Sequence, residues 1–397
     1  MCWFNCLLEN KMDYGLTETQ EMIRDLCRKV AQEKIKPIRE HYDESNEFPH
    51  EMIKVFAEAD LCGLYIDEKF GGLGGGIMDL AVGVEELSKV CSGIALAVAA
   101  TALGTFPIIL FGTDEQKQKY LPRIASGKSL AAFGLTEANA GSDAGGIKTT
   151  AVLDGDHYVL NGTKQWITNG GEAEIYTIVA ITNKAKGPRG ASAFIVEKGT
   201  PGFTFGKKEN KMGIRASATR ELVFQDCRIP KANLLSKEGM GFIVAMKTLD
   251  TSRPGVAAQA LGIAAGALDE AVEYSRQRRQ FGKPICAFQG VQFMLADMAT
   301  QVEAARALVY AAARYIDGGG KEVSKISAMS KLFASDVAMK VTTDAVQILG
   351  GYGYMKEYPV EKMMRDAKIT QIYEGTNQIQ REVIGLNLIK ESAAAKK

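Results

Sequence analysis

The residues best suited to chemistry lie near the C-terminal end, where positions 371–380 read QIYEGTNQIQ. One carboxylate, Glu374, stands between a tyrosine and Gly375, a residue that lets the backbone turn tightly. The side chains that follow are mainly amides, which form hydrogen bonds but carry no charge. A carboxylate in a dry pocket is a stronger base, because burial disfavours its charged form. Glu374 is therefore a candidate general base, although a single Glu is more commonly an exposed loop carboxylate.

Two stretches in the middle of the chain could contact a planar or phosphorylated ligand. Residues 132–146, AFGLTEANAGSDAGG, combine the hydroxyls of Thr136 and Ser142 with glycines that let backbone N–H groups approach a ligand. A glycine-rich connecting loop is the alternative interpretation. Residues 164–171, KQWITNGG, place Trp166 and Thr168 two apart, so that both face one side of a strand. An indole beside a hydroxyl could flank a polar ring, whereas a lone tryptophan more often belongs to the core.

Two further stretches in the last third could bind a phosphate-bearing cofactor. Residues 276–289, RQRRQFGKPICAFQ, contain Arg278, and a guanidinium group binds pyrophosphate with bidentate geometry. A solvated basic helix end followed by a turn explains the same residues equally well. Residues 347–354, QILGGYGY, end a helix at glycines, whose open backbone could touch a ligand or form an ordinary C-cap.

Common cofactor and metal motifs are missing from the sequence. Neither G-x-G-x-x-G nor G-x-x-x-x-G-K-[ST] occurs, and FGGLGGG at 70–76 has the wrong spacing and follows no strand. A Rossmann site and a P-loop are therefore disfavoured. The seven cysteines are scattered without a C-x-x-C pair, and there are only three histidines, so no metal site is expected. We expect reduced thiols in a cytoplasmic protein.

Length, composition and charge narrow the class of protein further. A chain of 397 residues is too long for one ordinary core, so two or three domains are expected. A net charge of +1 without a long Lys/Arg run argues against a nucleic-acid binder. No segment has 18 uninterrupted apolar residues, so no membrane span is expected. Residues 1–11 are interpreted as a disordered tail, or as the product of a start codon upstream of Met12, rather than a targeting signal.

Three zones of the sequence must position the candidate residues. Residues 12–130 show helical periodicity, beginning with Thr17 and Gln20 at capping-box spacing. Residues 131–240 consist of short β-branched and aromatic runs, including two about an Asp154-Gly155 turn, which predict a small β-barrel or sandwich. Residues 241–397 contain long Ala-rich helical runs that predict a bundle. The expected fold class is α+β and multidomain: an N-terminal helical domain, a middle β domain and a C-terminal helical bundle.

Six stretches together resemble the acyl-CoA dehydrogenase family. In order they are GLTEANAGSDAGG, WITNG, DTSRPGVAAQALG, RRQFGKPI, QILGGYGY and YEGTNQIQR, and the resemblance runs from about Leu16 to the end. The short-chain, butyryl-type dehydrogenases look most similar. The family fold is an N-terminal helical domain, a middle β-barrel and a C-terminal four-helix bundle, usually in a homotetramer. FAD lies between the barrel and the bundle.

The resemblance also implies a set of cofactor-binding residues. By motif match, the flavin half of FAD would contact Leu135, Thr136, Ser142, Trp166 and Thr168. The pyrophosphate and adenosine half would contact Arg278, Phe281, Gln289, Gln347, Gly350 and Gly351, partly from a neighbouring subunit. Thr376 and Gln378 would also line the FAD site.

Glu374 falls on the family's catalytic base. That base removes the α-proton of an acyl-CoA thioester while a hydride leaves the β-carbon for flavin N5, which gives the trans-2-enoyl-CoA. The Glu374 N–H, with a flavin ribityl hydroxyl, would form an oxyanion hole for the thioester oxygen. Ser142, Asp250, Arg253 and Gly375 are the other expected substrate-binding residues, with Arg253 near Glu374 to hold the loop. Electrons would pass to an electron-transferring flavoprotein.

Differences among relatives restrict the substrate. Isovaleryl-type members carry their base at about the position of Ser252, so Glu374 should be the only base here. Glutaryl-type members carry an arginine where this chain has Ala95, which makes a dicarboxylic substrate less suitable. A short linear acyl-CoA is expected, with a branched or cyclic acyl group open. The rivals on this fold are an acyl-CoA oxidase, a flavin monooxygenase and an enoyl-CoA reductase; a non-catalytic binding subunit is the rival of another class.

Overall fold

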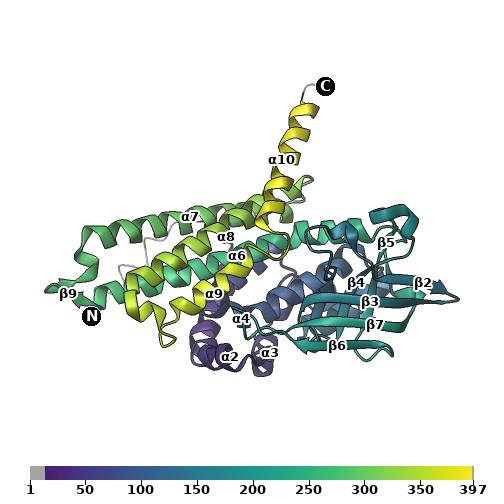
Figure 1. The fold of residues 1–397 in the computed structure, drawn as a ribbon, viewed down its shortest axis with the longest axis horizontal. Coiled ribbons are helices and arrows are strands. Elements are labelled where there is room, and N and C mark those ends of the chain that lie inside the picture. The colour runs from purple at the N-terminus through teal and green to yellow at the C-terminus, as the bar shows by residue number, and fades with distance from the viewer. Residues whose placement is uncertain (1–13, 396–397) are drawn as a thin grey trace.

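Helices and strands occupy separate parts of the molecule. The structure is a computed structural model that describes residues 14–395, so the tail expected at 1–11 lies outside the described residues. Helices form the first and last parts of the chain, and the strands gather at one end of the molecule, shown on the right of Figure 1. The three-part helix, sheet and helix architecture expected from the sequence is confirmed.

One long buried helix dominates the first part of the chain. The helices are α1 (Glu18–Val30), continued by a π-helical segment (Ala31–Ile35), α2 (Arg39–Ser45), α3 (His50–Glu58), α4 (Ile77–Phe111) and α5 (Asp114–Ala125). The capping box that opens α1 is confirmed, since the Thr17 hydroxyl accepts from the Gln20 N–H at 3.2 Å. By length and composition α4 could cross a membrane, but 72% of its most apolar window is buried within the protein. This makes α4 a core helix.

The second part of the chain is an eight-stranded sheet. Its strands are β1 (Ala131–Gly134), β2 (Thr150–Asp154), β3 (His157–Thr168), β4 (Ile175–Ile181), β5 (Ala191–Glu197), β6 (Phe203–Lys208), β7 (Thr219–Pro230) and β8 (Leu234–Leu235). The order is β6-β7-β3-β2-β4-β5-β8, and β1 pairs in parallel with β4. The hairpin about Asp154-Gly155 is confirmed, because β2 and β3 pair antiparallel with Asp154 opposite His157.

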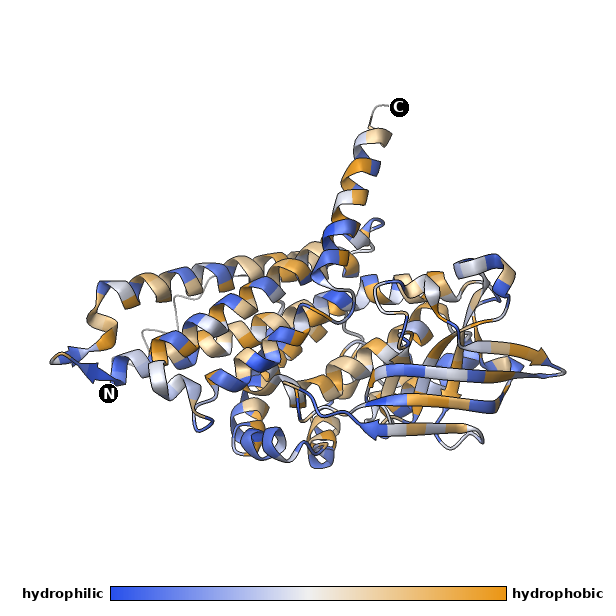
Figure 2. Cartoon of the chain, viewed as in Figure 1, coloured by the Kyte–Doolittle hydropathy of each residue, from blue (hydrophilic) through white to orange (hydrophobic). Residues whose placement is uncertain are grey.

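The last part is a bundle of long helices. It contains α6 (Gly241–Gln277), α7 (Gln289–Asp317), α8 (Val323–Leu349), α9 (Val360–Thr370) and α10 (Asn377–Ala394), with a short hairpin of β9 (Arg279–Gln280) and β10 (Lys283–Pro284) between α6 and α7. The long helices α6, α7 and α8 run side by side, whereas α10 projects from the body (Figure 1). Apolar turns remain on the projecting part of α10 (Figure 2), where Leu386 is 60% and Ile389 is 70% exposed.

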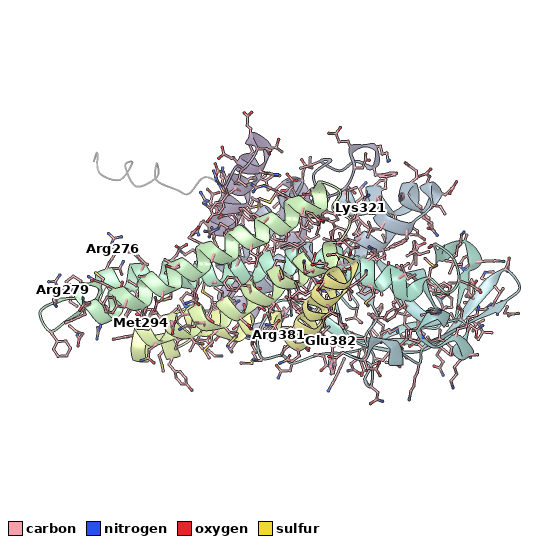
Figure 3. All side chains as sticks on the ribbon, turned by 90° about the horizontal axis from the view of Figure 1, so that it is seen from above. Arg276, Arg279, Met294, Lys321, Arg381 and Glu382 are labelled. Carbon is pink, nitrogen blue, oxygen red and sulfur yellow. The ribbon has the colours of Figure 1, made fainter. Side chains whose placement is uncertain are left out.

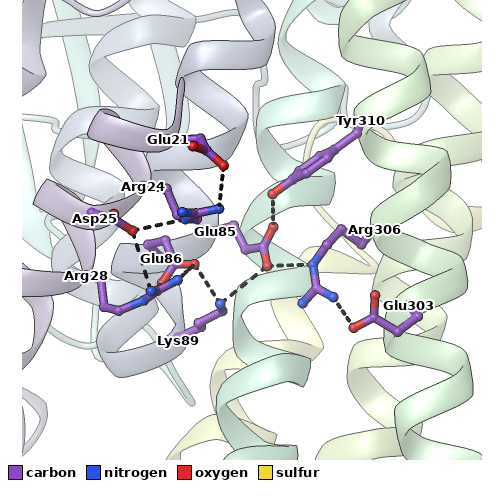
Figure 4. A network of polar contacts seen from close by, with 10 residues as sticks. All are labelled: Glu21, Arg24, Asp25, Arg28, Glu85, Glu86, Lys89, Glu303, Arg306 and Tyr310. Carbon is purple, nitrogen blue, oxygen red and sulfur yellow. Dashed lines mark hydrogen bonds and ion pairs between the residues drawn. The ribbon is translucent and has the colours of Figure 1, made fainter. Parts of the chain in front are cut away.

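A partly buried polar network joins the N-terminal helices to the bundle (Figure 4). Glu85 of α4 accepts hydrogen bonds from Arg306 at 3.0 Å and Tyr310 at 2.7 Å, both on α7. Lys89 lies 2.7 Å from Glu86, which also accepts from Arg28 of α1. Because each buried charge has an opposite partner, the network fixes how α1, α4 and α7 pack.

Candidate active site

A cavity of about 440 Å³ lies where the three parts of the chain meet. Its walls come from α4, the loops at the edge of the sheet, α6 and the loop between α9 and α10. The expected site residues that line it are Leu135, Thr136, Ser142, Trp166, Thr168, Arg253, Glu374 and Gly375. The structure therefore brings the expected base and the expected flavin contacts to one cavity, although they are up to 239 positions apart in sequence (135 against 374).

The loop that carries Glu374 has an unusual backbone. Glu374 has φ +52° and Gly375 has φ +92°, so two consecutive residues are left-handed. The sequence suggested a tight turn at Gly375 alone. The φ of Gly375 favours glycine, and a Cβ there would lie 2.6 Å from the Gln380 side-chain nitrogen, so Gln380 would have to move. A left-handed non-glycine residue is strained, and such strain persists only where the surroundings hold it.

Three side chains hold the carbonyl groups of this loop. Arg253 Nε donates to the Glu374 carbonyl at 3.4 Å, and Gln380 Nε2 donates to the same oxygen at 3.2 Å. The Gly375 carbonyl accepts from Gln380 at 2.9 Å and from the Lys331 ammonium at 2.8 Å. With both carbonyls fixed, the strained turn has a single orientation. The sequence interpretation missed Lys331 and Gln380.

The Glu374 carboxylate lies in a poorly solvated setting. Burial raises the pKa of this carboxyl, while a hydrogen bond from the Ser252 hydroxyl and the positive charges of Arg253 and Lys331 oppose the rise. The balance leaves the pKa raised, so the carboxylate binds a proton more tightly than an exposed glutamate does. A group of this kind can act as a general base toward a ligand in the cavity.

Arg253 is held by a carboxylate of its own helix. Its Nη1 donates to Asp250 Oδ1 at 2.7 Å, and the other Asp250 oxygen accepts from the Ser324 hydroxyl. Burial lowers the pKa of Arg253, and the negative charges of Asp250 and Glu374 counter that effect. Asp250 is not among the residues that line the cavity. Asp250 contacts Arg253, so its effect on the site acts through Arg253.

The residues that line the cavity include an exposed indole. Trp166 is 58% exposed and has φ +57°, and the pairing of β3 with β7 shifts between Lys164 and Ile167. The plain strand alternation assumed for Trp166 and Thr168 is thus interrupted by a bulge, yet both residues line the cavity. The core interpretation of Trp166 is wrong for this chain, since the ring leaves the core.

A buried ion pair supports the loop after β1. The Lys164 ammonium, fully buried, donates to Glu137 Oε1 at 2.8 Å and to the Leu135 carbonyl at 3.0 Å. Burial lowers the pKa of Lys164 to about 8, against the opposing charge of Glu137. The Glu137 carboxylate also accepts from the backbone N–H groups of Lys148 and Thr149, at 2.7 and 2.9 Å. These bonds set the course of the Leu135–Thr136 backbone along the cavity.

The remaining expected cofactor residues lie elsewhere in this chain. Arg278, Gly350 and Gly351 border a separate hollow of about 520 Å³, in which the Arg278 guanidinium stands over the Tyr352 ring at 5.3 Å. Phe281 is 94% exposed on the hairpin between α6 and α7, where the sequence suggested only a helix end and a turn. Gln289 starts α7 and Gln347 lies in the last turn of α8, both exposed.

This second group lies at the end of the bundle far from the sheet. The hairpin β9 is at the left of Figure 1 and the sheet at the right, and Figure 3 shows Arg276 and Arg279 at the same far end. Thr376 stands nearer the base, as the N-cap of α10 that accepts from the Ile379 N–H at 3.3 Å, and Gln378, two residues on, is exposed. One chain therefore does not bring the two expected halves of the cofactor site together.

Comparison with known proteins accounts for this architecture. Three family models match successive parts of the chain: the acyl-CoA dehydrogenase N-terminal domain at residues 17–128, the middle domain at 132–227 and the C-terminal domain at 239–389. The chain belongs to the acyl-CoA dehydrogenase family. The resemblance found in the six sequence stretches is thus confirmed.

Individual relatives of this acyl-CoA dehydrogenase match over nearly their whole length. It is 51% identical over 374 residues to the short-chain specific acyl-CoA dehydrogenase of Clostridium acetobutylicum, covering 94% of this chain and 98% of that one. It is 52% identical over 382 residues to the acryloyl-CoA reductase (NADH) of Anaerotignum propionicum, covering 96% and 97%. The structure of butyryl-CoA dehydrogenase from Megasphaera elsdenii superposes with a TM-score of 0.93 at 52% identity, covering 95% and 100%.

Proposed function

We propose that this acyl-CoA dehydrogenase oxidises a short-chain acyl-CoA thioester to the trans-2-enoyl-CoA, with Glu374 as the base. The supporting observation is the position of Glu374, whose carboxylate faces the cavity with a pKa raised by burial and whose backbone is held by Arg253 and Gln380. Relatives named as short-chain dehydrogenases add support at about half identity.

The loop supplies both a base and a hydrogen-bond donor. The Glu374 carboxylate takes the α-proton, and the Ser252 hydroxyl holds one of its oxygens in place. The Glu374 N–H donates to no group within residues 14–395, so it is free to donate to the thioester oxygen as negative charge develops there. Removing a donor of this type costs on the order of 3 kcal/mol of transition-state stabilisation.

The residues of the cavity fit FAD, which when bound supplies the acceptor for the hydride that leaves the β-carbon. Trp166 offers an exposed flat face, and the Leu135–Thr136 backbone, Ser142 and Thr168 lie around the same space. A Cβ added at Gly141 would meet nothing within 4 Å, so the chain's own packing does not require glycine there and room remains for a ligand.

The second half of the cofactor site is proposed to come from a neighbouring copy. Arg278, Phe281, Gln289, Gln347, Gly350 and Gly351 would serve the pyrophosphate and adenosine of a neighbour's FAD, while Thr376 and Gln378 lie near the base of the same chain. A Cβ at Gly351 would also lie in open space. The exposed apolar residues of α10 supply a further contact surface, and we propose a homotetramer.

The cavity wall favours a short acyl group. Tyr373, next to the base, donates to Gln259 Oε1, and Gln259 Nε2 donates to Ser92 Oγ of α4 at 2.6 Å. Gln259 and Tyr373 line the cavity beside aliphatic residues of α4. We propose that this hydrogen-bonded wall limits the apolar surface open to an acyl chain, which suits a short acyl group.

The direction of reaction and the electron acceptor form the second part of the proposal. We propose transfer to an electron-transferring flavoprotein, supported by a TM-score of 0.93 and 54% identity to a chain in a structure described as the electron transferring flavoprotein of Acidaminococcus fermentans. The Anaerotignum propionicum relative, named as a reductase, supports the opposite direction as the second candidate. Branched and cyclic acyl-CoA thioesters remain alternative substrates and belong in the same panel as the linear ones.

The test is anaerobic bleaching of the bound flavin by a panel of acyl-CoA thioesters. Butyryl-CoA should bleach the wild-type chain fastest, and Glu374→Gln should stay yellow and bind thioester without bleaching. Glu382→Gln, an exposed glutamate of α10, is the matched control and should bleach as the wild type does. Near-normal bleaching by Glu374→Gln would remove the base from the proposal.

Further assays separate the rival reactions. Steady peroxide formation with butyryl-CoA in air would favour an oxidase, and a colourless protein that takes up no FAD would favour a non-catalytic subunit. Faster turnover of crotonyl-CoA with a low-potential donor than of butyryl-CoA with an acceptor would favour the reductase direction.

A further inference from the structure

Lys331 is a buried cation directly beneath the catalytic loop. It lies on α8 with its side chain fully buried, and its ammonium donates to the Gly375 carbonyl at 2.8 Å and to Asn377 Oδ1 at 2.9 Å. Asn377 is held in turn by Ser335, whose hydroxyl accepts from its side-chain nitrogen at 2.9 Å, and by Asp336 at 2.8 Å. The lysine therefore contacts the residue after Glu374 and the first residue of α10.

The charge of Lys331 is not balanced by an ion pair. Within residues 14–395 no carboxylate oxygen lies within 4.0 Å of its ammonium, and both of its acceptors are neutral. Arg253, the other cation near the base, is already neutralised by Asp250 at 2.7 Å. An unpaired buried charge is costly, so its retention calls for a compensating interaction.

The charged groups that face Lys331 come from each element packed around it. Glu374 lies on the loop, Arg253 on α6 and Asp336 on α8 itself, and all three act on its charge. Asp336 is also bonded to Arg381 of α10 at 3.0 Å, near the surface. Glu374 is thus the acidic group facing Lys331 that is not already engaged by another cation at ion-pair distance.

We propose that Lys331 is a positioning residue for the dehydrogenation: its ammonium fixes the Gly375 peptide and supplies the positive charge that keeps the nearby Glu374 carboxylate ionised in the cavity. The inference rests on Glu374 being the base, as proposed above. Burial lowers the pKa of Lys331 to about 7, so this charge acts chiefly below neutral pH. The pKa of the Glu374 carboxyl is raised and Lys331 opposes that rise, so the protonation of the amine and that of the carboxylate are coupled.

The experiment measures the rate of flavin bleaching by butyryl-CoA in an anaerobic stopped flow, from about pH 5.5 to about pH 9. Lys331→Met removes charge and hydrogen bonds, Lys331→Gln keeps a neutral donor, and Lys331→Arg keeps the charge. Lys340→Met is the matched control, because Lys340 is an exposed lysine of the same helix paired with Asp344. FAD content and thermal melting are recorded for each variant.

The Met and Gln variants should bleach about tenfold or more slowly than the wild type at the acidic end, since loss of a nearby opposite charge disfavours the carboxylate. The gap should close as the pH rises, and Lys331→Arg should keep the acidic-end rate. An equal loss at every pH, or none, in FAD-loaded Gln and Met variants would reduce Lys331 to a structural residue and overturn the proposal.

Two other outcomes are also decisive. If no Lys331 variant retains FAD, the interaction between Lys331 and Glu374 is measured instead by NMR. The pKa of Lys331 is determined in ¹³C-lysine-labelled protein that keeps Lys331. The pKa of Lys331 should fall in Glu374→Gln, because that change removes the negative charge of the carboxylate. An unchanged pKa overturns the proposal. Failure of the wild type to bleach with any thioester would overturn the proposed function as well, whereas normal wild-type bleaching with unshifted variants overturns this inference alone.

Discussion

Replacing Ser252 by alanine tests how the pKa of Glu374, the proposed base, is set. The Ser252 hydroxyl donates to the Glu374 carboxylate, and this bond opposes the rise in pKa that burial causes. A hydrogen bond to a charged group contributes about 1.5–3 kcal/mol. Since about 1.4 kcal/mol is a factor of ten, Ser252→Ala should reduce the ionised fraction of Glu374, below its pKa, by about tenfold or more.

The sign of the effect sets the shape of the pH profile. Losing a bond to the charged form raises the pKa of Glu374 further, so Ser252→Ala should be slow at acidic pH and approach the wild-type rate at alkaline pH. Anaerobic stopped-flow bleaching by butyryl-CoA across pH measures this directly. The control is Ser275→Ala, another buried serine of α6, whose hydroxyl donates to its own helix at Val272. A Ser252→Ala profile that coincides with that control would refute the reasoning.

Three further changes test other parts of the structure. Gly375→Ala should lower the bleaching rate and cost about 1–3 kcal/mol of stability by thermal melting, because the φ of Gly375 is +92° and the added Cβ would meet Gln380. The control is Gly385→Ala, where the added Cβ meets nothing, and it should be neutral or stabilising. Lys164→Met should cost about 3–5 kcal/mol and lower FAD occupancy, because Glu137 is left as a buried charge without its cation; full occupancy would contradict this role. Deleting residues 386–397 should convert the proposed tetramer to dimers by light scattering without lowering FAD binding per chain, and unchanged mass would exclude α10 from the interface.

The large features of the fold could be predicted because they follow from local patterns. The β2–β3 hairpin is encoded by alternating residues around Asp154-Gly155, and the capping box of α1 by Thr17 and Gln20. The loop of the proposed base was located by the motif around Glu374. Its left-handed backbone at Glu374 itself was not, since that conformation depends on Arg253 and Lys331 from distant helices as well as on nearby Gln380.

Residues that support the site from behind leave only weak sequence signals. Lys331 occurs four positions after Ser327 and four before Ser335, so it shares a helix face with small, buried residues. A lysine in that register could have been recognised as buried. Its acceptor could not, because the contact with Gly375 depends on how the loop packs onto α8. The same applies to Lys164, whose partner Glu137 lies in a loop.

The three buried lysines of the described chain differ in how their charges are matched, and the difference bears on function. Lys362 pairs with Asp366 at 2.5 Å, and its pKa is raised. Lys164 pairs with Glu137 at 2.8 Å, and its pKa falls to about 8. Lys331 has neutral acceptors only, and its pKa falls to about 7. If packing alone required a long side chain beneath the catalytic loop, a buried carboxylate partner would stabilise it, as it does at the other two sites. A partner at Lys331 would, however, neutralise the positive charge that favours ionised Glu374, so the missing ion pair agrees with the proposed role of Glu374 as the base.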